Sequence, residues 1–158
     1  MSDTQSSNTL AGDTLTGETL TDSAHTISFD KQLGSVDWDV LRQDLIDDGF
    51  HNGRSSQQLR ESFENSRHCV MAFVGKRCIG KVRALSDGVG NAYVVDLWTQ
   101  SAFRNTGTGK KLMQLLLEEL KGQHVYLQTD DAIEFYRRLG FAAQPEGLSL
   151  IVGDYLQG

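Results

Sequence analysis

The stretch "FRNTGTGKKL", Phe103–Leu112, decides the fold because it joins a predicted strand to a predicted helix through a glycine-rich turn. The apolar run "YVVDLWT" before it has the composition of a strand. After it, apolar residues recur at helical spacing from Gly109 to Leu120. The first N–H groups of a helix are unpaired and positively polarised, and glycine lets an anion approach the backbone closely. The stretch therefore predicts a phosphate-binding loop.

Spacing excludes two common phosphate loops. In a P-loop, Arg104 would have to be glycine and Lys111 would have to be serine or threonine. In the dinucleotide fingerprint, Leu112 would have to be glycine. What remains is the pattern R-x-x-G-x-G, Arg104–Gly109, which by itself is equally compatible with an ordinary helix start that has a basic first turn.

The first 24 residues differ in composition from the rest of the chain. "TLAGD", "TLTGE" and "TLTD" form a short tandem repeat in a tract rich in Ser, Thr and Gly. Such a tract has little to bury, so we expect residues 1–24 to be a flexible tail and residues 25–158 to be the folded domain.

Within residues 25–158, the pattern predicts an α+β fold around a mostly antiparallel sheet. Strands are predicted at 25–29, 67–74, 77–85, 91–100, 123–129 and 149–156, and helices at 37–49, 55–66, 109–120 and 131–139. Asp131 and Glu134 have the spacing of a capping box at the start of the last helix.

Composition limits the classes of function. A 158-residue chain is long enough for one domain with a real core, and its net charge of −6 argues against a nucleic-acid partner and weakly favours a cationic one. No run of about 18 apolar residues predicts a membrane span, and the N-terminus does not resemble a signal or transit peptide. The four histidines lack metal spacing, and we interpret Cys69 and Cys78 as reduced core thiols of a cytoplasmic protein.

The pattern at Arg104–Gly109 resembles the coenzyme A pyrophosphate loop of the GNAT N-acetyltransferase superfamily. Two further segments strengthen this resemblance: the strand "YVVDLWTQ" just before the loop, and "FYRRLGF", Phe135–Phe141, in the last helix. Together they cover Val70–Phe141. The resemblance implies a mixed, mostly antiparallel sheet of six to seven strands flanked by about four helices.

The resemblance also implies how acetyl-CoA would bind as a co-substrate. In GNAT enzymes the strand before the loop bulges and splays from the next strand, and the pantetheine arm lies in the gap. Leu97 would face the thioester oxygen through its backbone N–H, and Trp98 and Thr99 would line the arm. Thr129 stands where many members have asparagine, and it would contact the cofactor with less reach. The loop would contribute Arg104, Asn105, Thr106, Gly107, Thr108, Gly109 and Lys110.

Two residues are candidates for the chemistry. Tyr136 matches the tyrosine that acts as a general acid toward the leaving thiolate in this superfamily; the alternative is an aromatic core residue. Asp96 lies in an apolar strand, where partial desolvation would raise its pKa and suit it to be the base for the amine. The alternatives are that Asp96 binds the substrate ammonium or belongs to a hydrogen-bond network.

The predicted function is transfer of the acetyl group of acetyl-CoA to a primary amine, without a metal, by direct transfer in a ternary complex. The acceptor would be a small molecule or a peptide, and the resemblance leaves room for a homodimer. The alternative is a non-catalytic module of the same fold that binds acyl-CoA for regulation or sensing. No membrane or nucleic-acid partner is expected.

Overall fold

The computed structural model describes residues 17–22 and 24–156. One sheet of six strands forms its centre, with the strands in chain order across the sheet. Neighbouring strands are antiparallel except for the last pair, which is parallel. The strands are β1 (Thr19–Thr21), β2 (Thr26–Asp30), β3 (His68–Val74), β4 (Arg77–Ser86), β5 (Asn91–Thr99) and β6 (His124–Tyr126).

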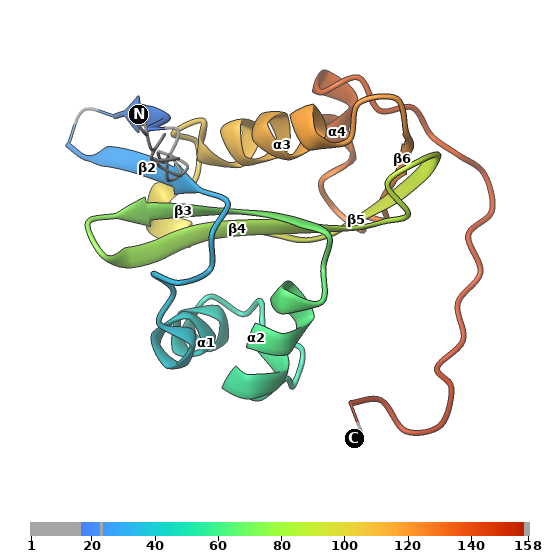
Figure 1. The fold of residues 1–158 in the computed structure, drawn as a ribbon, viewed down its shortest axis with the longest axis horizontal. Helices are drawn as coiled ribbons and strands as arrows, with labels where there is room; N and C mark the ends of the chain where they lie inside the picture. The colour runs from blue at the N-terminus through green and yellow to red at the C-terminus, as the bar shows by residue number, and fades with distance from the viewer. Residues whose placement is uncertain (1–16, 23, 157–158) are drawn as a thin grey trace, which may run out of the picture.

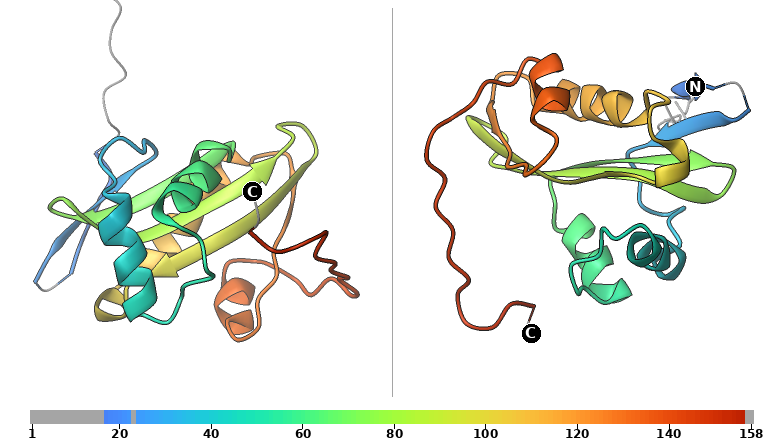
Figure 2. Two further views of the ribbon diagram at one scale, coloured as in Figure 1. Left: turned by 90° about the horizontal axis from the view of Figure 1, so that it is seen from below. Right: turned by 180° about the vertical axis from the view of Figure 1, so that it is seen from behind.

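Helices cover both faces of the sheet (Figure 1). One face carries the two helices that precede β3, and the other carries the two that follow β5 (Figures 1 and 2). The helices are α1 (Trp38–Asp47), α2 (Ser56–Glu64), α3 (Thr108–Glu119) and α4 (Ile133–Arg138). This α+β architecture of one mixed, mostly antiparallel sheet and four helices confirms the predicted fold class.

Each face of the sheet has its own hydrophobic core. Leu112 and Leu116 of α3 are fully buried in a core that includes Val70 and Val82 from the sheet. On the other face, Leu41 of α1 and Phe63 of α2 pack in a second core, which also holds Trp98. Strand β4 is buried along both faces as a result, so its side chains do not alternate between core and solvent.

Local sequence signals fix the starts of the first two helices. The Asp37 side chain accepts a hydrogen bond from the backbone N–H of Val40, and Ser55 forms a capping box with Gln58. The start of α3 differs, because its N-cap residue is Gly107 with φ of 88° and has no capping side chain. The first turn of α3 therefore keeps backbone N–H groups that no cap side chain occupies.

The predicted boundary between tail and domain is wrong by several residues. Thr19–Thr21, placed in the flexible tail, form β1 and pair with β2. Leu20 packs against the core, and Glu18 forms an ion pair with Lys111 of α3. The third copy of the tandem repeat thus forms an edge strand, and its apolar side chain, Leu20, packs against the core. The rest of the predicted tail, residues 1–16 and 23, lies outside the described residues.

The predicted strand at 149–156 is also wrong. These residues form no strand, and the segment after α4 runs as an extended arm along one side of the molecule (Figures 1 and 2). Leu148, Leu150 and Val152 are 95%, 86% and 87% exposed. A β-rich composition does not make a strand without a neighbour to pair with, and this arm has no pairing partner in the described chain.

Candidate functional site

A cleft of about 1220 Å³ opens where β5 meets the glycine loop, α3 and α4. Most of the predicted site residues line it, although they come from three separate segments of the chain. Those residues are Asp96, Leu97, Trp98, Thr99, Arg104, Asn105, Gly107, Gly109, Lys110, Thr129 and Tyr136. β5 and β6 pair with each other only through Asn91–Tyr93. Beyond Tyr93 the two strands no longer pair with each other, and the cleft lies at this end.

A β-bulge interrupts β5 at the floor of the cleft. Val95 pairs with Arg83 and Trp98 pairs with Lys81, so Asp96 and Leu97 together lie opposite one residue of β4. Asp96 has φ of 61°, in the left-handed region that side-chain-bearing residues seldom adopt. A bulge leaves its extra residue out of the regular ladder and redirects the backbone locally. The bulge that the resemblance implied is therefore present at the predicted residues.

The glycine loop is built to expose the start of α3. Asn105 and Gly107 both have positive φ, which turns the chain sharply before the helix. Thr106 and Thr108, two predicted cofactor contacts, do not line the cleft. Thr106 instead bonds the carbonyl of Phe103 at 2.6 Å and the hydroxyl of Thr108 at 2.7 Å. These two threonines hold the loop in shape, and the backbone of the loop faces the cleft.

Arg104 lines the cleft, but its guanidinium group is already paired. It bonds Asp48 at 2.6 Å and the backbone oxygen of Thr99 at 3.1 Å. Asp48 also accepts a 2.8 Å bond from the indole nitrogen of Trp98. Burial by itself would raise the pKa of Asp48, but bonds from Ser101 and Trp98 outweigh it and lower the pKa. Asp48 thus ties the end of α1 to β5 and to the glycine loop.

The side chain of Trp98 points away from the cleft. It is 2% exposed and packs in the core between the sheet and helices α1 and α2. Trp98 can therefore line the cleft only through its backbone, whereas Leu97 packs on the α3 side of the sheet.

Asp96 is surrounded by three cations. Arg54 donates to both carboxylate oxygens, at 2.9 and 2.8 Å, and Arg83 donates to one of them at 2.5 Å. The Lys81 Nζ lies 3.8 Å from the carboxylate. Burial alone would raise the pKa of Asp96, but the Lys81 charge and the Arg54 hydrogen bonds hold it well below its usual range.

These contacts correct the prediction for Asp96. The sequence predicts that desolvation raises its pKa, but the neighbouring cations reverse the direction of the shift. The alternative made from the sequence, that Asp96 belongs to a hydrogen-bond network, is what the structure shows. A carboxylate held as a counter-ion to three cations is a poor proton acceptor.

Tyr136 is half-buried and lines the cleft from α4. Its ring packs edge-on against Phe135 and Phe141, with centroid distances of 5.0 and 5.9 Å. Burial, together with the charge of Asp131, raises the pKa of its hydroxyl. The phenol therefore stays protonated at neutral pH and can donate a proton or a hydrogen bond.

Thr129 caps the segment before α4, where the sequence placed Asp131. Its hydroxyl accepts a 3.0 Å bond from the backbone N–H of Ala132, and α4 begins without a side-chain cap from its own N-cap residue. The capping-box prediction for Asp131 and Glu134 is therefore wrong. Thr129, Asp130 and Asp131 all line the cleft.

Several neighbours of the site were missed from the sequence. Phe50 and Gln128 line the cleft, and Arg54, Arg83 and Lys81 bond to Asp96 in the bulge. Arg54 follows a predicted helix in an ordinary loop, so no local pattern marks it. Lys81 interrupts the apolar run "RCIGKVRAL", and a charged residue in a strand buried on both faces is the signal that could have drawn attention to it.

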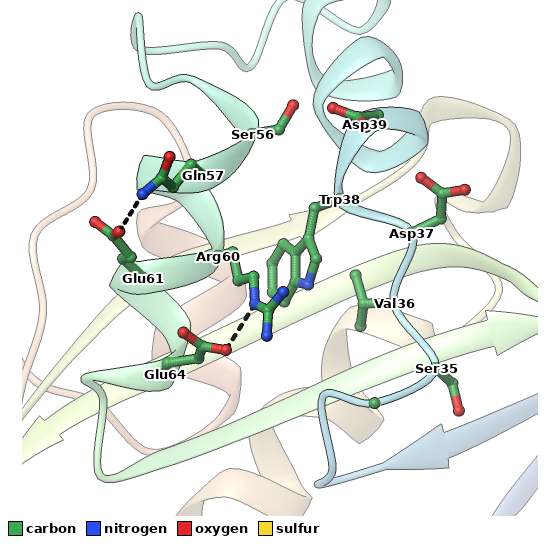
Figure 3. A pocket seen from close by; sticks show the side chains of 11 residues that line it. Ser35, Val36, Asp37, Trp38, Asp39, Ser56, Gln57, Arg60, Glu61 and Glu64 are labelled. Carbon is green, nitrogen blue, oxygen red and sulfur yellow. Dashed lines mark hydrogen bonds and ion pairs between the residues drawn. The ribbon is translucent and has the colours of Figure 1, made fainter.

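A second hollow, of about 820 Å³, lies between α2 and the segment that leads into α1 (Figure 3). It contains none of the predicted site residues. Four of its polar side chains pair with one another, Gln57 with Glu61 at 2.8 Å and Arg60 with Glu64 at 2.7 Å. The cleft at β5 is therefore the better candidate for the active site.

Comparison with known proteins agrees with this fold. Residues 38–141 match the model of the Acetyltransferase (GNAT) family, and the protein belongs to that family. It is 39% identical over 77 residues to histone acetyltransferase TAP1 of Glycine max, a match covering 46% of this chain and 33% of the relative. It is 29% identical over 103 residues to the chloroplastic serotonin N-acetyltransferase 2 of Oryza sativa subsp. japonica, covering 60% and 52%.

The fold also resembles solved structures of GNAT-family proteins. The crystal structure of a GNAT-family protein from Xanthomonas campestris pv. campestris superimposes with a TM-score of 0.70 at 22% identity, covering 83% of this chain and 97% of that one. The matched segment spans a third to a half of the two curated relatives. Among residues 17–22 and 24–156, no helix has the length and apolarity to cross a bilayer, and no cluster of potential metal ligands occurs.

Proposed function

We propose that this protein transfers the acetyl group of acetyl-CoA to a primary amine. The observation that carries the proposal is that one cleft contains the β5 bulge, the glycine start of α3 and the Tyr136 hydroxyl. The first two are backbone features that suit a thioester carbonyl and a pyrophosphate, and the third suits a leaving thiolate. Membership of the GNAT family supports the same reaction class.

In the proposed complex, the pyrophosphate lies against the loop around Gly107 and the exposed start of α3. Backbone N–H groups and the positive end of the helix favour an anion there. Lys110, at the same end of α3 and on the cleft, adds a positive charge. Arg104 contributes by holding the loop to Asp48 and β5, since that is where its guanidinium group bonds.

The pantetheine arm then runs along β5, so that the thioester carbonyl reaches the backbone N–H of Leu97. The amine nitrogen attacks the carbonyl carbon and forms a C–N bond while both substrates are bound. The N–H donor stabilises the negative charge that develops on the oxygen. The C–S bond then breaks, the thiolate takes the Tyr136 hydroxyl proton, and the proton lost by the amine passes to water and returns to Tyr136 through solvent.

Asp96 has no proton-transfer role in this scheme, because its three cationic neighbours keep it ionised. The surplus positive charge around it also disfavours an ammonium ion at the bulge, so the neutral form of the amine is the form that reacts there.

The test is thiol release from acetyl-CoA in the presence of a panel of amines. The panel contains spermidine, free amino acids, a lysine-containing histone peptide and serotonin; two relatives carry the names of histone and serotonin acetyltransferases. We expect amine-dependent thiol release with at least one of them, above the rate without amine. Absence of acetyl-CoA binding in calorimetry would reject the proposal.

One observation favours a second candidate, a module that binds acyl-CoA without turnover. A free carboxylate base would favour catalysis over binding alone, and the structure instead makes Asp96 a partner of Arg54, Arg83 and Lys81. Tight CoA binding with no thiol release across the whole panel would support this second candidate.

A further inference from the structure

Lys81 is a fully buried lysine in the centre of the sheet, immediately behind the cleft. Its side chain has 0% exposure. The Nζ lies 5.3 Å from the centroid of the Phe63 ring and 5.4 Å from that of Phe50, so the cation contacts two aromatic rings. Burying a lysine costs free energy unless the charge is paired, so the contacts that Lys81 makes must offset this cost.

The hydrogen bond from Lys81 goes to the backbone of the bulge. Its Nζ donates to the carbonyl oxygen of Asp96 at 3.2 Å. That carbonyl and the N–H of Leu97 belong to the same peptide group. In a trans peptide the C=O and the N–H point in opposite directions, so fixing one fixes the other. The N–H of Leu97 therefore points away from Lys81.

A second set of contacts holds Asp96 through its side chain. The Asp96 carboxylate accepts hydrogen bonds from Arg54, in the loop between α1 and α2, and from Arg83, in β4. Asn52 accepts a 3.0 Å bond from Arg54 and keeps that side chain in place. These contacts hold Asp96 at its unusual φ of 61°. The orientation of the peptide group between Asp96 and Leu97 is held by the hydrogen bond from Lys81.

We propose that Lys81 is a positioning residue for acetyl transfer: by bonding the Asp96 carbonyl, it aims the Leu97 N–H at the thioester carbonyl. A positive charge on the acceptor side of a peptide group also polarises that group and makes its N–H a stronger donor. This inference rests on the proposed function, since it assigns a supporting residue to the carbonyl site of acetyl-CoA.

The test observes the thioester carbonyl itself and needs no knowledge of the amine. Acetyl-CoA labelled with carbon-13 at the carbonyl is bound to the protein, and the chemical shift of the label is measured by NMR. In the unaltered protein we expect a downfield displacement on binding, because a hydrogen bond polarises the carbonyl. In Lys81→Met we expect at least half of that displacement to be lost, while the Kd for CoA without the acetyl group stays within threefold.

Methionine is close to lysine in size and is apolar, so Lys81→Met is expected to fold. Lys81→Gln is the second variant, with circular dichroism and thermal unfolding recorded for both. Lys76→Met is the matched control, the same exchange at an exposed position in the turn between β3 and β4, and it should keep the full displacement.

The outcomes separate this inference from the proposed function. If the unaltered protein does not bind acetyl-CoA, the proposed function fails. If it binds and Lys81→Met shows the same carbonyl displacement, the positioning role is overturned and the proposed function stands. Loss of CoA binding in both folded Lys81 variants would also overturn the positioning role, because Lys81 would then support the whole cleft.

Discussion

Arg54 donates to both carboxylate oxygens of Asp96, at 2.9 and 2.8 Å, across 42 residues of sequence. The bond joins the loop between α1 and α2 to the bulge of β5, and so connects one helical layer to the floor of the cleft. Both side chains are largely buried, with 8% and 13% exposure. In this setting an ion pair acts as a structural link and a single partner cannot be removed cheaply.

Asp96→Asn should therefore destabilise the fold. Asparagine keeps the size of the side chain but leaves Arg54, Arg83 and Lys81 without their common counter-charge. We expect the free energy of unfolding to fall by about 3 kcal/mol, measured by urea denaturation at pH 7. Asp39→Asn, at an exposed position on α1, is the control and should change it by less than about 0.5 kcal/mol. A fully stable Asp96→Asn protein that has lost only activity would return Asp96 to the role of base.

The second prediction concerns Lys81 and pH. Burial, only partly offset by the charge of Asp96, lowers the pKa of Lys81 to about 8 from its ordinary value of 10.5. Between these two values the unfolded chain holds a proton that the folded protein does not hold, so stability must rise with pH. Relative to Lys81→Met, the unaltered protein should gain up to about 3 kcal/mol of unfolding free energy from pH 8 to above 10.5.

Urea denaturation of both proteins at matched pH values measures this gain. The two cysteines lower the unfolding free energy as the pH rises, which is opposite to the effect of Lys81. Burial raises the pKa of Cys69 to about 11 and that of Cys78 to about 12, so the folded protein keeps protons that the unfolded chain loses. Both proteins contain these thiols, and the difference between the two stability curves removes their effect. Parallel curves across this range would mean that Lys81 is not desolvated as the structure indicates.

Tyr136→Phe tests the proton donor. The exchange keeps the aromatic packing on Phe135 and Phe141 and removes only the hydroxyl. We expect kcat to fall about 100-fold with the amine that the panel identifies, a usual size for loss of general acid catalysis. The Kd for acetyl-CoA should stay within twofold. Tyr126→Phe is the control, because that hydroxyl bonds His124 on β6. Unchanged kcat in Tyr136→Phe would leave this tyrosine a packing residue.

Gly107→Ala tests the loop. With φ of 88°, Gly107 adopts a conformation that alanine disfavours by about 1–2 kcal/mol. A Cβ at this position would lie 3.6 Å from a carbon of Leu20, an ordinary contact, so the cost is one of backbone strain. We expect lower stability by about that amount and at least fivefold weaker CoA binding in calorimetry. Gly34→Ala, where nothing lies within 4 Å of the new Cβ, should change neither.

The cleft could be predicted in part from short segments. The glycine turn Arg104–Gly109 and the helix start after it follow from patterns within a few residues of sequence, because turns and helix starts are local in the chain. The bulge at Leu97 and the position of Tyr136 follow from the resemblance to the GNAT superfamily. The wrong strand assignments arose where a segment needs a neighbouring strand with which to pair. The segment 149–156 has the composition of a strand, and Thr19–Thr21 has that of a tail, but pairing with β2 decided that only the second joins the sheet.

By itself, the sequence determined the resemblance to the family, most of the helices and strands, and the glycine start of α3. The resemblance depends on short motifs such as Arg104–Gly109 and Phe135–Phe141, and the helices and strands depend on local periodicity. Only the tertiary structure decided the role of Asp96. Burial alone predicts a raised pKa, but folding brings Arg54, Arg83 and Lys81 around the carboxylate and reverses the shift. Electrostatic energy depends on distances through space, and the sequence does not state which charges will meet.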